Sequence, residues 1–227
     1  MLIRFDGRTA IVAGAARGIG QTIVRSLAND GARVIACDLL ADDLAALAGR
    51  VDGGGEIIAA KVDVTNEASI AEVVRSAGGA DILVYVAGGV RGQRPRPPEE
   101  VSADDFDAIV DANLKGAFLF IKAVAPGMKT KGTGRIVTIS SRAGLATSLT
   151  GIQSYPAAKH GQIGLVKQLA QELGPFGITV NTVAPGFMAT SPDYEGQWNN
   201  WPAAFATISS TRLRCGVWAR RRISPMR

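Results

Sequence analysis

The chain has 227 residues, of which 47% are hydrophobic and 20% charged, a composition typical of one soluble globular domain and unlike that of disordered or fibrous chains. Its longest apolar runs, such as Ile82–Ala87, fall far short of the ~20 residues needed to span a bilayer. Charged residues occupy positions 4, 6 and 8, where a secretory signal peptide would have its apolar core. We therefore expect a cytoplasmic protein with no membrane partner.

The cysteines, the histidine and the location of the charge exclude further classes of protein. Cys37 and Cys215 cannot form a thiolate zinc site by themselves, and the single His160 excludes motifs with two histidines, so we expect no bound metal. The net charge of +5 comes from the last 21 residues, which have no acid and hold Arg212, Arg214, Arg220, Arg221, Arg222 and Arg227. Residues 1–206 therefore have a net charge of −1, which argues against a nucleic-acid partner.

Short β-branched segments alternate with longer segments of helical period, as in chains built from β-α-β units. The expected strands are Thr9–Ala13, Arg33–Cys37, Glu56–Ala60, Ile82–Val86, Arg135–Ile139 and Ile178–Val183. The expected helices are Gly18–Asn29, Asp42–Leu47, Glu67–Ala77, Ala103–Val124 and Pro156–Leu173. No repeat or low-complexity linker divides them. The pattern predicts an α/β fold, with one domain built on a doubly wound parallel sheet that is buried on both faces.

A glycine-rich loop joins the first expected strand to the first expected helix. It reads Gly14-Ala15-Ala16-Arg17-Gly18-Ile19-Gly20. Glycine there permits a tight turn, a close approach of the backbone to a pyrophosphate, and close packing of the helix on the strand. The N–H groups at the start of the helix favour the negative charge of the phosphates. The loop therefore predicts a dinucleotide-binding site.

Asp38 stands at the end of the second expected strand, directly after Cys37 and 18 residues after Gly20, near the spacing at which an acid accepts hydrogen bonds from the adenosine ribose. A carboxylate there would repel the 2′-phosphate of NADP, whereas the guanidinium of Arg17 could hold that phosphate. We give Asp38 the greater weight and expect NAD as the cofactor, with NADP as the alternative.

Tyr155 and Lys159 are four residues apart at the start of a segment of helical period, so both side chains fall on one helix face. Lowering the pKa of a tyrosine by ~2 units takes roughly 2.7 kcal/mol. A cation about 4 Å away supplies on the order of 4 kcal/mol at an effective dielectric constant of ~20, before desolvation. Tyr155 could then act as the general base for oxidation of an alcohol, or as the general acid for reduction of a carbonyl.

Together these motifs resemble the short-chain dehydrogenase/reductase family from residue 5 to about residue 206. The residues that carry the resemblance are the loop glycines 14, 18 and 20, Asp63-Val64, Ala87-Gly88, Asn113-Leu114, Ser140-Ser141, Tyr155-Pro156-Ala157-Ala158-Lys159 and Pro185-Gly186. The resemblance implies a Rossmann fold and an NAD(P)-dependent enzyme that acts on CH–OH groups.

The resemblance also implies a role for each matching residue. Ser141 would hold the substrate oxygen, Tyr155 would exchange the proton, Lys159 would lower the pKa of Tyr155 and bind the nicotinamide ribose, and Asn113 would hold a water in a proton relay. The implied cofactor-binding residues are Gly14, Arg17, Gly18, Ile19, Gly20, Asp38, Asp63, Val64, Ala87, Gly88, Tyr155, Lys159, Pro185, Gly186 and Thr190. Asp63 and Val64 would line the adenine pocket, and Pro185, Gly186 and Thr190 would position the nicotinamide.

The sequence departs from the family pattern in three segments. Ala13 replaces the usual Thr before the loop, and Tyr85-Val86 replaces an Asn pair, so we expect apolar packing where the family has polar groups. Pro156 follows the tyrosine directly and is expected to bias Tyr155 away from helical geometry.

Beyond about residue 206 the resemblance ends, and residues 207–227 read as an atypical basic tail. We interpret that tail as a frameshifted or otherwise altered terminus, so that the family's last strand is expected to be missing. The function predicted is hydride transfer between NAD(H) and a secondary alcohol or ketone, in a homodimer or homotetramer if the tail permits. The alternatives are an NADPH-dependent oxoacyl carrier-protein reductase and a catalytically impaired nucleotide-binding relative.

Overall fold

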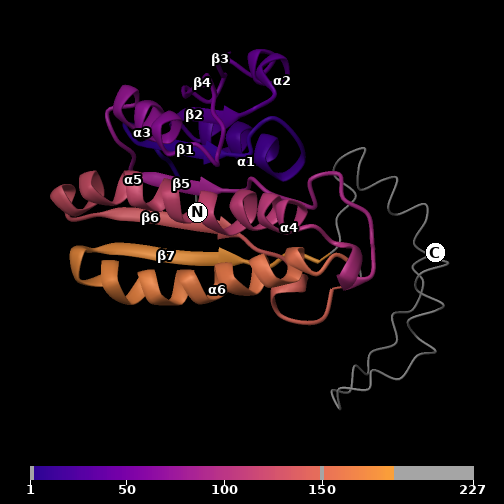
Figure 1. Cartoon of the computed structure of the whole chain (residues 1–227). Coiled ribbons are helices and arrows are strands. Elements are labelled where there is room, and N and C mark those ends of the chain that lie inside the picture. Colours follow the sequence, from indigo (N-terminus) through magenta and orange to yellow (C-terminus); the bar gives the residue numbers. More distant parts are fainter. Residues whose placement is uncertain (1–2, 149–150, 187–227) are drawn as a thin grey trace, which may run out of the picture. The chain divides into compact units, whose positions relative to one another are not determined.

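The computed structural model describes residues 3–148 and 151–186, which belong to one structural unit, Met1–Met188. Its sheet has seven strands in the order β3-β4-β2-β1-β5-β6-β7 (Figure 1). The strands are β1 (Thr9–Ala13), β2 (Arg33–Asp38), β3 (Gly49–Arg50), β4 (Glu56–Lys61), β5 (Ile82–Tyr85), β6 (Gly134–Ile139) and β7 (Ile178–Val183). All neighbours pair in parallel except β3 and β4. The predicted doubly wound parallel sheet is confirmed.

Helices cover both faces of this sheet. Alternate side chains of each strand point to opposite faces, and both sets are apolar and pack against helices. The α-helices are α1 (Gly18–Asn29), α2 (Ala41–Ala45), α3 (Glu67–Ser76), α4 (Ala103–Val110), α5 (Gly116–Lys131) and α6 (Ser154–Leu173). In β1, Ala10 and Val12 belong to the core that includes residues of α1 and α2. Ile11 belongs to the larger core that includes residues of α3, α5 and α6. This three-layer arrangement is visible in Figure 1.

Most element ends lie within two residues of the prediction, and three further differences bear on the structure. The short strand β3 has no hydrophobic pattern, and it pairs with β4 because the backbone of Val51 donates to Gly55 and closes the turn between them. The expected helix Ala103–Val124 extends to Lys131 and is interrupted by a π-helical segment, Asp111–Lys115. Helix α6 begins at Ser154, so Pro156 stands in its first turn, where a missing N–H removes no helical hydrogen bond. Tyr155 is therefore helical, contrary to the expectation from Pro156.

Tyr85 shows what replaces one of the family's polar groups. Its side chain is fully buried, its ring lies 5.8 Å from that of Phe120, and its hydroxyl donates a 2.6 Å hydrogen bond to the carbonyl of Ala112. The expectation of apolar packing is correct for the ring of Tyr85. It did not include the hydroxyl, which makes a polar contact with the π-helical segment.

The substitution Tyr85→Phe should lower the free energy of unfolding by about 1–3 kcal/mol, because the buried carbonyl of Ala112 would lose its donor while the ring packing is kept. Urea denaturation measures this. A variant as stable as the wild type would show that the Ala112 carbonyl finds another donor.

Candidate active site

The predicted site residues follow the carboxyl ends of the parallel strands, which meet at one edge of the sheet where ligands of open α/β sheets bind. Those at strand ends are Gly14 after β1, Asp38 at the end of β2, Asp63 after β4, Ala87 after β5, Ser141 after β6 and Pro185 after β7. Thr190 and the basic tail lie outside the described residues, and so does the segment in which a last strand would occur. The fold thus brings together segments more than 170 residues apart in the sequence.

The glycine loop connects β1 to α1 as predicted. Gly14 has a φ of +82°, and a Cβ there would come within 2.5 Å of the backbone nitrogen of Ala87. A Cβ on Gly20 would collide with the carbonyl of Gly14. No side chain caps the N-terminus of α1, so the N–H groups of its first turn face no competing side-chain acceptor. These features fit the pyrophosphate of a dinucleotide.

The carboxylate of Asp38 faces the glycine loop. Its Oδ2 accepts a 3.0 Å hydrogen bond from the backbone N–H of Ala16, and its Oδ1 accepts one of 3.2 Å from Leu40. The guanidinium of Arg17, the next residue of the loop, donates through Nε to Asp43 of α2 at 2.5 Å. The acid that favours NAD and the arginine that could hold the 2′-phosphate of NADP are therefore held by different partners.

Asp63 and Val64 follow β4. The N–H and the hydroxyl of Thr65 donate to Asp63 Oδ1 at 2.9 and 2.8 Å, and these hydrogen bonds hold the pKa of Asp63 below its usual range. Val64 is buried. This pair presents a fixed carboxylate and an apolar side chain, the combination expected beside an adenine ring.

Asn113 lies within the π-helical segment, and its buried side chain holds the loop that follows Ala87 and Gly88. Its Oδ1 accepts from the N–H of Gly89 at 2.9 Å, and its Nδ2 donates to the carbonyls of Gly89 and Ile109 at 2.9 and 2.8 Å. A Cβ on Gly88, which has a φ of +141°, would collide with this amide. The side chain of Asn113 therefore positions the loop.

Sequence reasoning missed Gln162, whose Nε2 donates to the backbone carbonyl of Asn113 at 3.1 Å. Gln162 is fully buried, and its Oε1 has no hydrogen-bond partner among the described residues. Its signal in the sequence is a polar residue three positions after Lys159, on the same face of the helix.

Lys159 and Tyr155 converge, as their spacing predicted. Lys159 Nζ lies 5.8 Å from the centroid of the Tyr155 ring, and both residues are buried. The Lys159 ammonium donates a 2.9 Å hydrogen bond to the carbonyl of Ile139 at the end of β6. Burial lowers the pKa of Lys159 from its usual 10.5 to about 7. Desolvation therefore opposes the cationic form that the electrostatic argument requires.

The two serines after β6 differ in their surroundings. Ser140 is buried, and its hydroxyl donates to the backbone carbonyl of Lys159 at 3.0 Å, which joins β6 to α6. The hydroxyl of Ser141 accepts a 3.1 Å hydrogen bond from the N–H of Ala143, and this residue is half-buried. Of the two serines, Ser141 is thus the one with solvent access. Pro185, also half-buried, accepts at its carbonyl from the N–H of Arg142 at 2.8 Å, beside Ser141, and Gly186 is exposed.

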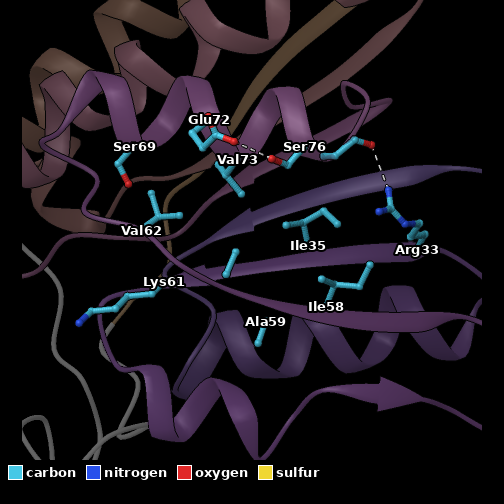
Figure 2. A pocket seen from close by; sticks show the side chains of 12 residues that line it. Arg33, Ile35, Ile58, Ala59, Lys61, Val62, Ser69, Glu72, Val73 and Ser76 are labelled. Atoms are coloured by element: carbon cyan, nitrogen blue, oxygen red, sulfur yellow. Dashed lines mark hydrogen bonds between the residues drawn. The ribbon is translucent and has the colours of Figure 1, made fainter.

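A separate hollow of about 390 Å³ lies between α3 and the sheet, and none of the predicted site residues lines it (Figure 2). Its floor includes Ile35 and Ile58, and Glu72 of α3 accepts a 3.0 Å hydrogen bond from Ser76 beside it. In the described part of the chain, no helix is long and apolar enough to cross a membrane, and no three His, Cys, Asp or Glu side chains are grouped to bind a metal.

Comparison with known proteins identifies the family of the chain. The family model described as short chain dehydrogenase matches residues 8–200. D-threitol dehydrogenase from Mycolicibacterium smegmatis is 39% identical over 192 residues, which cover 82% of this chain and 72% of that protein. The 3-oxoacyl-[acyl-carrier-protein] reductase of Vibrio cholerae is 38% identical over 215 residues, which cover 93% of this chain and 86% of that protein.

Solved structures agree as well. A 7α-hydroxysteroid dehydrogenase complexed with NADH is similar with a TM-score of 0.75 and 32% identity, over 86% of this chain and 80% of that one. A 3-oxoacyl-[acyl-carrier protein] reductase with bound NAD from Brucella melitensis has a TM-score of 0.77 and 34% identity, over 86% of this chain and 78% of that one.

The fold and the site define an oxidoreductase with a dinucleotide-binding sheet. The chain belongs to the short-chain dehydrogenase family, whose members are NAD(P)-dependent enzymes that act on CH–OH groups.

Proposed function

We propose that the protein interconverts a secondary alcohol and a ketone with NAD(H), and that Tyr155 exchanges the proton with the substrate oxygen. The observation that carries the proposal is the buried pair of Tyr155 and Lys159, with Nζ 5.8 Å from the centroid of the tyrosine ring. When bound, the nicotinamide cofactor supplies or accepts the hydride, so the protein has to orient the substrate and transfer one proton.

In this proposal Tyr155, Ser141, Lys159 and Asn113 each have a distinct task. Tyr155 gives its hydroxyl proton to a carbonyl oxygen, or takes one from an alcohol. The hydroxyl of Ser141 donates a hydrogen bond to the same substrate oxygen. Lys159, when protonated, favours the phenolate of Tyr155, and its carbonyl is anchored by Ser140. Asn113 holds the loop after β5 through Gly89, and its carbonyl is kept in place by Gln162.

The preference for NAD is supported by the position of Asp38. Its carboxylate is fixed at the glycine loop by the N–H of Ala16, where it accepts from ribose hydroxyls and repels a 2′-phosphate. The two similar structures cited above hold NADH and NAD.

A second candidate is reduction of a 3-oxoacyl thioester on a carrier protein. It is favoured by the Vibrio cholerae reductase, which aligns with 93% of this chain. Turnover of a 3-oxoacyl thioester with NADPH, faster than that of any free alcohol or ketone with NAD(H), would select this function over the first.

Assembly of identical copies through the helices that contain Asn113 and Lys159 belongs to the proposal. Phe106 on α4 and Phe118 on α5 keep 38% and 43% of their surface exposed, which supports a partner there. Light scattering of the purified protein should give the mass of a dimer or tetramer.

The direct test is a titration of the purified full chain with NADH and NADPH, followed by a panel of secondary alcohols and ketones. We expect NADH to bind more tightly than NADPH, and at least one substrate to be turned over with NAD(H). Binding of NADH without turnover of any substrate would indicate an impaired nucleotide-binding relative. Absence of binding would overturn the proposal.

A further inference from the structure

We propose that Asp43 is a specificity-determining residue for the cofactor, because it holds the guanidinium of Arg17 and so denies the cofactor the one loop cation suited to a 2′-phosphate. This inference rests on the proposed function and deepens it. It assigns a role to a residue of α2 that no motif of the sequence singles out.

The geometry at the end of β2 carries the inference. Arg17 Nε donates to Asp43 Oδ2 at 2.5 Å, and this is the only ion pair that Arg17 makes within the described residues. The residue before it, Ala16, donates its backbone N–H to Asp38. Arg17 therefore directly follows the loop residue that binds the acid of the ribose site, and the ion pair with Asp43 draws its guanidinium toward α2.

The balance of charge makes this ion pair matter for the choice of cofactor. A 2′-phosphate brings about two negative charges and three acceptor oxygens, and the fork of an arginine is the side chain best suited to hold them. The loop and α2 offer it one arginine, already paired, against the carboxylates of Asp38, Asp42 and Asp43. NAD brings no such charge, so its binding does not require Arg17 to leave its partner.

The ion pair is strong enough to bias Arg17 and weak enough to be released by one substitution. The side chains of Arg17 and Asp43 are 55% and 34% exposed, so solvent screens their attraction. Asp43→Asn removes the partner charge and keeps the shape of the side chain. Because Asp43 lies on the short helix α2 and is not buried, the fold should survive the change.

The neighbouring acid provides a matched control. Asp42 lies in the same first turn of α2, is more exposed, and makes no ion pair in the part of the chain that the structure describes. Asp42→Asn changes the net charge near the ribose site by the same amount without releasing Arg17. A difference between the two variants therefore reports on Arg17 and not on the general electrostatic potential.

The test is calorimetric titration of the full chain with NADH and with NADPH at one fixed ionic strength of about 0.15 M, where the Debye length of about 8 Å limits the long-range effect of net charge. Asp43→Asn should lower the Kd for NADPH by about three- to tenfold and change that for NADH by less than about twofold. Asp42→Asn should change both by less than about twofold. In an Arg17→Ala background, Asp43→Asn should no longer improve NADPH binding.

Equal improvement by the Asp42 and Asp43 variants would overturn the inference, since charge alone would then explain it. If Asp43→Asn still improved NADPH binding in the Arg17→Ala background, the inference would also be wrong. It would be wrong as well if Asp43→Asn left the Kd for NADPH unchanged, as expected if the released Arg17 paired with Asp38 instead. These failures are distinct from failure of the proposed function, in which the wild-type chain does not bind NADH.

Discussion

The substitution Tyr155→Phe should reduce kcat by about 10²–10⁴-fold, while the Kd for NADH stays within about twofold of the wild-type value. The ring of Tyr155 packs with Ile109, Ala143 and Ile152, and phenylalanine keeps that packing. The change therefore removes the proton donor and acceptor and leaves the fold and the cofactor site in place. Steady-state kinetics with the best substrate of the panel, together with calorimetry for NADH, measures both quantities.

Tyr85→Phe is the matched control for this experiment. It also removes one hydroxyl from a buried tyrosine, but that hydroxyl donates to the carbonyl of Ala112 and has no part in the proposed proton transfer. At a temperature well below its unfolding transition, this variant should turn over substrate at the wild-type rate. If Tyr155→Phe retained most of its activity, another group would be the proton carrier and the proposed mechanism would be wrong.

Much of the fold could be predicted because parallel strands buried on both faces leave a direct trace in the sequence. Their side chains are apolar on both sides, as in Ala10, Ile11 and Val12 of β1, which are all fully buried. The glycine loop could be predicted because Gly14 occupies a backbone conformation and a tight contact that other residues do not tolerate. The convergence of Tyr155 and Lys159 follows from helical periodicity alone.

The features that were missed depend on contacts between distant segments. The π-helical segment has no local signature, and the carbonyls of Ala112 and Asn113 within it accept hydrogen bonds from Tyr85 and Gln162, which lie on β5 and α6. The pairing of Arg17 with Asp43 likewise requires α2 to lie beside the loop. Periodicity describes one element at a time, so it cannot predict which side chains from other elements will supply a missing partner.

Lys159→Met should separate stability from activity, because the charge of Lys159 is costly to bury. The amine has lost nearly all contact with solvent, and burial lowers its pKa to about 7. The unfolded chain binds this proton up to a pH near its usual 10.5, so between these two values the unfolded state holds more protons than the folded state. The free energy of unfolding should therefore rise with pH across this window, by up to about 1.4 kcal/mol per pH unit from this group.

Below pH 7 the full cost of burying the charge is present, and Lys159→Met removes it. At pH 6 the variant should unfold at higher urea concentration than the wild type, even though the carbonyl of Ile139 loses its donor, which costs about 1–3 kcal/mol. Its advantage should shrink as the pH rises toward 10. Turnover should fall by about 10²-fold or more, because nothing then favours the phenolate of Tyr155.

Lys167→Met is the control for this comparison, since Lys167 lies eight residues further along α6 and is exposed. It should change neither turnover nor the pH dependence of unfolding. Urea titrations of the three proteins at several pH values between 6 and 10 give the required slopes. If wild type and Lys159→Met had parallel stability curves over that range, Lys159 would titrate as it does in water, and the cation required beside Tyr155 would be present without any cost of burial.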